Sequence, residues 1–365
     1  MPQIVYINVS TTATETPSNL QQMGAIVSFG GTSLTSGTYQ AITSTADFTA
    51  IASSASADVG NAVTDFYKQG SGTVYVLELG STGTPSTLLD AYISANPKTF
   101  YGFLIPDGVI ASDSQFATMV QNYVAQDSMT YFFLNCTQAQ AAAFNRAKSV
   151  IAHVPSPDAT STELLAAHTF YEVINSNPSA SNKLAPFAFR YLYGVTPWAD
   201  KGNATVMSEM KSANLNFAGT GAQGGVSEDL LFWGYTLDGK PISYWYAVDW
   251  VQIHLARDLA YEIITGSNSK VNPLIYDQRG ITRLQTKATG TLNNGINCGC
   301  IVSGASVSAI PYGDYITANP GDYATGTYNG LSATITPMRG FEQITFYLSV
   351  DFTGSDVTTM TTTGS

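Results

Sequence analysis

Residues 234–295 read GYTLDGKPISYWYAVDWVQIHLARDLAYEIITGSNSKVNPLIYDQRGITRLQTKATGTLNNG, the stretch with the densest secondary-structure signals in the chain. From about residue 249 to 264 an apolar residue recurs at every fourth position, namely Val251, Leu255, Leu259 and Ile263. Trp250 and other apolar residues widen this stripe to well over half of the circumference, which predicts a core helix buried on several sides. Gly266 is the expected C-cap of this helix.

A second helix is predicted from Asp277 to Leu292. One of its faces is apolar and consists of Ile281, Leu284, Ala288 and Leu292. The other face is basic and consists of Arg279, Arg283 and Lys287. Residues three and four positions apart share a helix face, so the two sets are separated in space. The pattern indicates a core helix followed by a facing helix that offers its basic side to a partner.

Strands and helices alternate upstream of this stretch. Strands are predicted at residues 73–79, 99–105 and 129–135, and helices at 61–69, 85–95, 112–126 and 137–148. This alternation indicates a mostly parallel sheet covered by helices. Thr160 and Glu163 have the spacing of a capping box, which predicts another helix up to about Ile174. After an expected boundary at 196–198, we expect a flexible glycine-rich turn at 219–225 and a strand at 296–307.

Both ends of the chain are predicted to be β-strands. In residues 3–9 one face carries Val5, Ile7 and Val9. In residues 343–352 the apolar face consists of Ile344, Phe346, Leu348, Val350 and Phe352. The polar segment 10–22 has the composition of a linker between the first strand and the body of the protein. A lone strand is not stable, so each terminal strand must pair with something else.

The composition argues against several classes of protein. Of the 365 residues, 11% are charged and 12% are aromatic, which does not suit intrinsic disorder. The formal net charge of −11 argues against a nucleic-acid binder. The sequence has neither a signal-peptide pattern nor an apolar run long enough to span a bilayer. We therefore expect no direct membrane insertion, and a protein made and kept in a cytoplasm or in a particle assembled there.

No catalytic constellation stands out, so we predict no enzyme, no cofactor and no metal. The histidines His153, His168 and His254 lie far apart, and the loop at 80–83 lacks a phosphate-binding motif. The cysteines Cys136, Cys298 and Cys300 fit neither a disulfide framework nor a zinc site, and we interpret them as small buried hydrophobes. Asp258 and Glu262 form a like-charged pair that either faces a cation from a neighbouring subunit or lies on a solvated helix face.

The order of these elements resembles the contractile-tail sheath proteins of bacteriophages and of related contractile injection machines. The matching segments are AIVSFGG (25–31), ITSTADFTAIA (42–52), FYKQGSGTVYV (66–76), MKSANLNF (210–217), FWGYTL (232–237), the helix after Asp249-Trp250, and residues 341–352. The resemblance rests on their common order along the chain. It implies a mixed α/β (α+β) protein of two α/β domains with extended N- and C-terminal β-strand arms that pair with neighbouring subunits.

The same resemblance implies a division into an N-terminal arm (1–24), an outer α/β domain (25–197), an inner, tube-facing α/β domain (198–342) and a C-terminal strand arm with tail (343–365). It also implies an ATP-independent structural subunit that polymerises helically around a tail tube and contracts to drive the tube through the host envelope. β-Strand exchange of the terminal arms would link the subunits. The helix with Trp250 would then be the platform of the inner domain.

The partners implied by the resemblance are further copies of the chain, the tail tube protein, and the baseplate and tail terminator proteins, in a virion assembled in the bacterial cytoplasm. For the tube we hypothesise that Arg279, Arg283 and Lys287 make weak contacts with an acidic surface, the alternative being an ordinary solvated helix face. Two competing functions remain. One is another structural component of a virion or injection machine, and the other is a Rossmann-like nucleotide-dependent enzyme.

Overall fold

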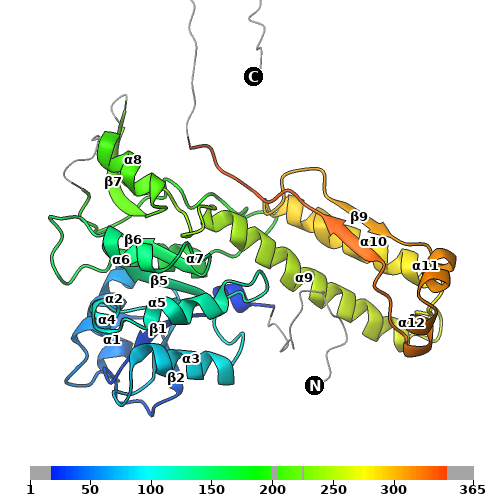
Figure 1. Cartoon of the computed structure of the whole chain (residues 1–365), viewed down its shortest axis with the longest axis horizontal. Helices are drawn as coiled ribbons and strands as arrows, with labels where there is room; N and C mark the ends of the chain where they lie inside the picture. Colours follow the sequence, from blue (N-terminus) through cyan, green and yellow to red (C-terminus); the bar gives the residue numbers. More distant parts are fainter. Residues whose placement is uncertain (1–17, 199–203, 224–225, 343–365) are drawn as a thin grey trace, which may run out of the picture.

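The computed structural model describes residues 18–198, 204–223 and 226–342. Its centre is a six-stranded sheet in the order β2-β3-β1-β4-β5-β6 (Figure 1). The strands are β1 (Gly24–Ser28), β2 (Thr38–Ile42), β3 (Val74–Glu78), β4 (Gly102–Leu104), β5 (Tyr131–Asn135) and β6 (Val150–His153). All neighbouring strands are parallel except β2 and β3. The predicted mostly parallel sheet is confirmed, although its edge strands β2 and β6 lie outside the predicted strands.

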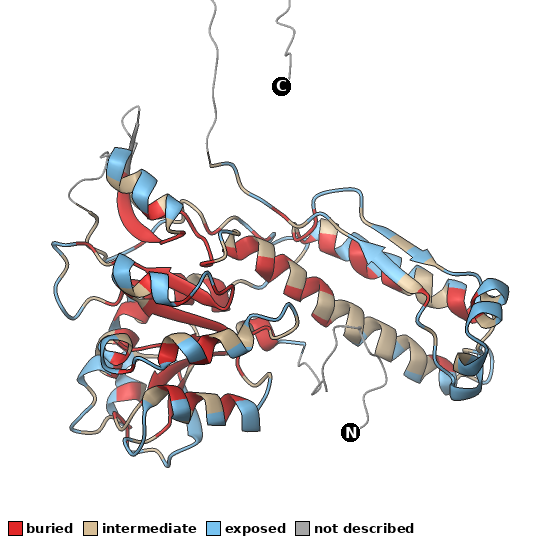
Figure 2. Cartoon of the chain, viewed as in Figure 1, coloured by how far each residue is buried: buried red, intermediate tan, exposed pale blue. Residues whose placement is uncertain are grey.

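Each inner strand is buried on both faces. On β5, Tyr131 and Phe133 point to one side of the sheet, while Phe132 and Leu134 point to the other. The first side is covered by α2 (Ala57–Lys68) and α7 (Leu165–Ile174), and the second by α3 (Pro85–Ala95) and α5 (Phe116–Met119). Figure 2 shows the buried strands between these helical layers. Continuous apolar runs are typical of such doubly covered parallel strands.

Short helices complete the two layers: η1 (Leu20–Gln22), α1 (Thr45–Thr49), α4 (Val109–Ser112), η2 (Val120–Tyr123) and α6 (Gln138–Ala143). The single helix predicted at 112–126 is wrong, because α4, α5 and η2 divide this region. Asp113 causes the break between α4 and α5. Its carboxylate accepts hydrogen bonds from the backbone N–H groups of Ser86 (2.7 Å) and Gln115 (3.0 Å), which turns the chain between the two helices.

The capping box predicted at Thr160 and Glu163 does not form, and α7 begins only after it. Glu163 is used elsewhere, because its carboxylate accepts hydrogen bonds from the Thr196 backbone N–H (2.9 Å) and hydroxyl (2.6 Å). A reciprocal capping box joins Thr137 and Gln140 at the start of α6. The spacing alone did not predict this difference, since a carboxylate is free to cap its own helix or a distant loop.

The segment after the predicted boundary at 197/198 stays close to the sheet. It contains α8 (Ala204–Ser212) and the antiparallel pair β7 (Phe217–Gln223) and β8 (Val226–Phe232). Backbone hydrogen bonds connect it to the edge of β6, from Val154 N–H to Asn216 O (2.8 Å) and from Leu237 N–H to Val150 O (3.0 Å). Residues 219–223 belong to β7, so the flexible turn predicted to start there is wrong at those positions. The predicted domain limits themselves stay predictions.

Two long helices leave the sheet and form what we call the helical extension, residues 242–334 (Figure 1). It consists of α9 (Ile242–Ser267), α10 (Gln278–Asn297), β9 (Ser306–Ala309), α11 (Tyr312–Ala318), α12 (Pro320–Thr325) and β10 (Leu331–Thr334). Only the first half of α9 is enclosed by the sheet layers, whereas its second half is largely half-buried or exposed (Figure 2). Burial on several sides along the whole of α9 is therefore wrong.

Gly266 does not cap α9 but lies buried within it. A Cβ at this position would lie 2.5 Å from Leu274 Cβ, so the glycine allows the loop between α9 and α10 to pack closely against the helix. α9 ends one residue later at Ser267, and Asn268 is its C-cap. Both predicted helices of this stretch are confirmed, with longer bounds.

The strand predicted at 296–307 is wrong in its first part, because α10 continues to Asn297. Gly299 has φ +75°, its N–H donates to Ile296 O (3.0 Å), and the Cys300 N–H donates to Gly295 O (2.9 Å). These two bonds form a Schellman motif, the helix ending that a left-handed glycine favours. The apolar run around the cysteines is thus the end of a helix, and β9 starts only at Ser306.

Candidate functional site

Asp249 links the N-terminal half of α9 to the sheet. Its carboxylate is fully buried and accepts hydrogen bonds from the hydroxyls of Tyr101 (2.9 Å) and Tyr131 (2.8 Å). Burial raises the pKa of Asp249 to about 6, although the Lys148 amine and the two hydroxyls favour the charged form. The same burial, together with the neighbouring carboxylate, raises the pKa of both tyrosines well above the ordinary range.

Lys148 is a buried lysine near Asp249. Its amine lies 4.5 Å from the centre of the Trp245 ring and 5.9 Å from that of Tyr131, and burial lowers its pKa. Perturbed titratable groups are candidates for catalysis when they line a cleft. A cleft does lie between α9 and α10, but neither Asp249 nor Lys148 lines it. Asp249, Lys148 and the two tyrosines therefore fit a structural attachment of α9 better than an active site.

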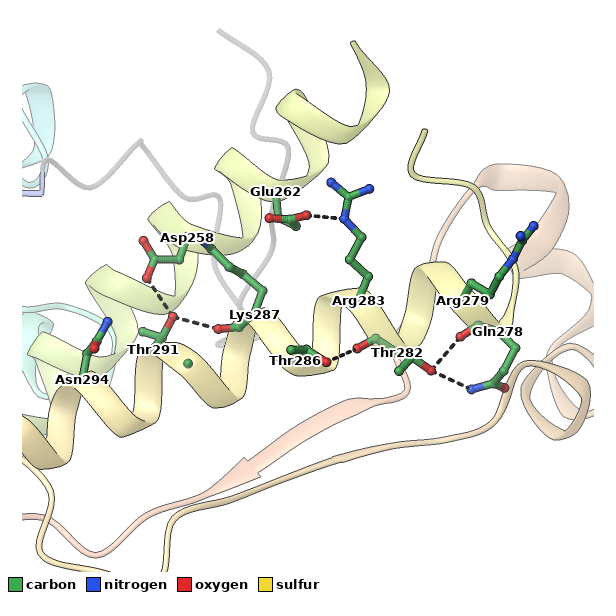
Figure 3. A pocket seen from close by; sticks show the side chains of 11 residues that line it. Asp258, Glu262, Gln278, Arg279, Thr282, Arg283, Thr286, Lys287, Thr291 and Asn294 are labelled. Carbon is green, nitrogen blue, oxygen red and sulfur yellow. Dashed lines mark hydrogen bonds and ion pairs between the residues drawn. The ribbon is translucent and has the colours of Figure 1, made fainter. Parts of the chain in front are cut away.

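A polar cleft of about 630 Å³ separates α9 from α10 (Figure 3). Asp258 and Glu262 line it from α9, opposite Arg279, Arg283 and Lys287 from α10. Arg283 forms an ion pair with Glu262, and Asp258 accepts a hydrogen bond from the Thr291 hydroxyl (2.7 Å). The cation facing Glu262 therefore comes from the same chain. This corrects the expectation of either a neighbouring subunit's cation or a solvated face.

The three predicted tube-facing cations differ in their surroundings. Arg279 is the most exposed, with 87% of its side chain accessible and an ion pair to Asp277 at 3.2 Å. Arg283 also donates to Asn272 O (2.8 Å), and the Lys287 amine lies 5.6 Å from the centre of the Tyr261 ring. The cations of α10 thus lie along one side of the cleft, but Arg283 already has internal partners.

The remaining residues considered for catalysis or metal binding include His254 and the three cysteines. His254 stacks on Trp250 with ring centres 3.8 Å apart, and burial lowers its pKa. Within residues 18–198, 204–223 and 226–342 no group of three potential metal ligands was found. In that same part of the chain, none of the helices combines the length and apolarity needed to cross a bilayer. All three cysteines are free and buried.

Of the predicted assembly residues, Trp250 and Val251 are buried, while Leu255, Leu259 and Ile263 are half-buried. The strand residues Val5, Ile7, Val9, Ile344, Phe346, Leu348, Val350 and Phe352 lie outside the described residues. The antiparallel β9–β10 pair lies beside α10, where Gln285 Nε2 donates to Val307 O (2.9 Å). In the part of the chain that the structure describes, each of its two strands pairs with the other alone.

A tyrosine cluster at the far end of the extension lies outside every sequence prediction. It consists of Tyr276, Tyr312, Tyr315, Tyr323 and Tyr328, with ring centres from 4.7 to 6.3 Å apart. Tyr323 remains largely exposed, while Tyr315 is buried and donates to Asp322 (2.5 Å). The density of tyrosine between 312 and 328 is a local signal for this cluster, but the participation of Tyr276 depends on the packing of the α9–α10 loop.

Comparisons with solved structures define the class of this fold. A chain of the anti-feeding prophage (AFP) baseplate has TM-score 0.64 and 14% identity, covering 96% of this chain and 99% of its own. A chain of the AFP helical sheath in the contracted state has TM-score 0.59 and 14% identity, covering 95% and 98%. A sheath tail protein from Listeria innocua has TM-score 0.51 and 9% identity, covering 81% and 90%.

The chain therefore has the fold of contractile-tail sheath proteins over nearly its whole length. No family model and no curated protein sequence matches it. The likeness is thus one of fold, carried by the arrangement of the sheet, the helical layers and the extension.

Proposed function

We propose that this protein is a structural subunit of a contractile tail sheath. It polymerises helically around a tail tube and contracts to drive the tube through an envelope. The observation that carries the proposal is the match over 95% of this chain and 98% of a chain of the AFP helical sheath in the contracted state. The paired charges and the tyrosines on the surface of the helical extension agree with a role in assembly.

Strand exchange by the terminal segments links the subunits in this proposal. The alternating residues at 3–9 and 343–352 are suited to adding strands to a neighbour's sheet, where backbone hydrogen bonds give strength and side chains set the register. The β9–β10 pair is the acceptor we favour, because a two-stranded ribbon is marginally stable and gains most from additional strands. Subunits tied together in this way can change helical radius without separating.

The partners in this proposal are other copies of the chain, a tail tube protein, and baseplate and terminator proteins, within a virion or a related injection particle. The subunit is not an enzyme, and the energy for contraction is stored during assembly rather than supplied by a nucleotide. Head-to-tail contacts between identical subunits generate helical arrays of this kind.

Electron microscopy of the purified full-length protein tests the proposal. We expect helical tubes or sheath-like cylinders after concentration or incubation with the tube protein. Small uniform particles that bind a nucleotide would support the Rossmann-like enzyme instead. The likeness to a chain of the AFP baseplate favours a baseplate-proximal component as the second candidate, for which short rings are expected instead of long tubes.

The basic side of α10 is the proposed tube contact. Arg279 and Lys287 are the members to vary, because Arg283 is held by both Glu262 and the Asn272 carbonyl, whereas Arg279 is 87% exposed despite its ion pair with Asp277. Reversing both charges, Arg279→Glu with Lys287→Glu, should weaken co-assembly with the tube about tenfold, since solvated ion pairs contribute roughly 0–1 kcal/mol each. Pelleting with tube protein at low and high salt measures this.

The control is Lys270→Glu, which reverses one charge in the exposed loop after α9, half the charge change of the double variant. It should leave co-assembly unchanged. Equal loss in the control and the double variant would show a net-charge effect and remove α10 as the tube contact, as would unchanged co-assembly in the double variant.

A further inference from the structure

Residues 335–342 connect the helical extension back to the sheet side of the molecule, and we call them the strap (Figure 1). Backbone hydrogen bonds fix its first part, from Val302 N–H to Thr336 O (3.0 Å) and from Met338 N–H to Cys300 O (3.0 Å). Farther along, a Cβ on Gly340 would lie 2.7 Å from Pro186 Cβ, so the strap runs directly against the segment that follows α7. It ends at Glu342, from which the chain continues into residues 343–365.

Glu342 is held at this end by three side chains from different parts of the fold. Lys211 on α8 contacts one carboxylate oxygen at 3.0 Å, and Arg339 within the strap contacts the other at 2.9 Å. Burial by itself would raise the pKa of Glu342, but hydrogen bonds from Tyr235, Lys211 and Arg339 lower it to about 2. Only 15% of this side chain is exposed, although it follows Phe341, which is 84% exposed.

The position of Lys211 is itself fixed. Its amine lies 4.5 Å from the centre of the buried Trp233 ring, which follows directly after β8. The Lys211–Glu342 contact thus joins residues 131 positions apart in the chain and ties the end of the strap to the layer of α8 and β8. We call Glu342, Lys211, Arg339 and Tyr235 the exit clamp.

We propose that the exit clamp sets the point from which the C-terminal strand segment leaves the subunit, and thereby its reach and register on a neighbouring subunit. This inference rests on the proposed strand exchange. Without the clamp, backbone hydrogen bonds would fix the strap only as far as Met338, and the four residues 339–342 would keep only the packing of Gly340 against Pro186. At about 3.3 Å per extended residue the exit point could then move by roughly 13 Å, several register steps of a strand.

Lys211→Met and Glu342→Gln test the clamp in the full-length protein. Because a longer free tether lowers the effective concentration of the strand at its acceptor, each variant should raise the critical concentration for tube assembly about three- to tenfold. Lys211→Arg keeps the charge and should assemble like the wild type. Light scattering and electron microscopy measure assembly.

Lys68→Met is the matched control. Lys68 is 39% exposed and pairs with the buried Asp65 at 2.7 Å, compared with 42% exposure and 3.0 Å for Lys211. Lys68 lies on α2, and its loss should leave assembly unchanged. A general effect of removing one lysine from a half-exposed ion pair would appear equally in both variants and would overturn the proposal.

Chymotryptic cleavage after Phe341 in the unassembled subunit gives a readout that separates positioning from stability. Lys211→Met and Glu342→Gln should speed this cleavage several-fold while leaving the thermal midpoint of unfolding within a degree or two of the wild type. Unchanged cleavage, or a loss of assembly that follows only a lowered midpoint, would contradict the clamp.

Deletion of residues 343–365 distinguishes this inference from the function on which it rests. If the deleted protein still assembles normally, strand exchange by this segment is wrong. If the deletion prevents assembly but both clamp variants assemble like the wild type, strand exchange stands and the exit clamp is wrong.

Discussion

Asp249 is a buried acid whose ionisation opposes folding, and it makes stability depend on pH. Because burial raises its pKa from 3.8 to about 6, the folded state takes up this proton at a higher pH than the unfolded state. The resulting stabilisation is present at low pH and is lost as pH rises through this window. Between pH 5 and pH 7.5 the wild type should therefore lose about 1 kcal/mol relative to Asp249→Asn, whose amide does not titrate.

Urea unfolding of the unassembled subunit at both pH values measures this difference. Asparagine can still accept the hydrogen bonds from Tyr101 and Tyr131, so the variant should remain folded. As a control, Asp158→Asn at an exposed position should show the same pH dependence as the wild type. A pH-independent difference between the wild type and Asp249→Asn would mean that Asp249 does not titrate in this range.

Two glycines within α10 differ in the space available for a side chain. A Cβ on Gly280 would lie 1.9 Å from the Ile275 carbonyl oxygen, whereas a Cβ on Gly290 would meet no atom within 4 Å. Gly280→Ala should therefore destabilise the α9–α10 connection by about 1–3 kcal/mol, as overpacking does. Gly290→Ala should stabilise α10 by about 1 kcal/mol, because alanine favours a helix interior.

Denaturant unfolding followed by circular dichroism compares these two variants on the same helix. Each serves as the control for the other, because both make the same chemical change. Shifts of the same sign would mean that the loop at Ile275 relaxes freely or that Gly290 is restricted by a neighbour. Either result would contradict the packing of the extension described above.

At the scale of the whole molecule, the terminal segments should be separable from folding. Leu20 is fully buried and Gln21 donates to Tyr246 O (2.8 Å), so the N-terminal truncation must stop before this turn. Deleting residues 1–17 or 343–365 should leave a folded monomer that cannot polymerise, because the core is retained and the proposed linking strands are lost. Sedimentation velocity and thermal denaturation measure the two properties separately. Global unfolding of either truncated protein would show that its segment belongs to the core.

Local pattern predicted the elements of this protein well where a single segment carries the signal. The apolar runs at β3, β4 and β5 are continuous because these strands are covered on both faces, and the fourfold spacing after Trp250 identified α9. Local signals failed where the same short segment could form either a strand or the end of a helix. The run around Cys298 and Cys300 has the composition of a strand, but Gly299 in a left-handed conformation makes it a helix terminus.

The charged residues of the candidate site could be predicted from the sequence, but the ion pairs between them could not. The charges at Asp258, Glu262 and Arg283 are plain in the sequence, yet only the crossing of α9 and α10 makes Glu262 and Arg283 partners within one chain. The pairing of Lys211 with Glu342 has no local signal, since it joins residues 131 positions apart.

Hydrophobic period and turn chemistry act over a few residues, so the amino-acid sequence alone was enough to predict the inner strands β3, β4 and β5 and the two long helices. Charge pairing and tyrosine packing depend on which surfaces the folded chain brings together. For that reason only the tertiary structure decided the polar cleft, the tyrosine cluster at the tip and the clamp at Glu342.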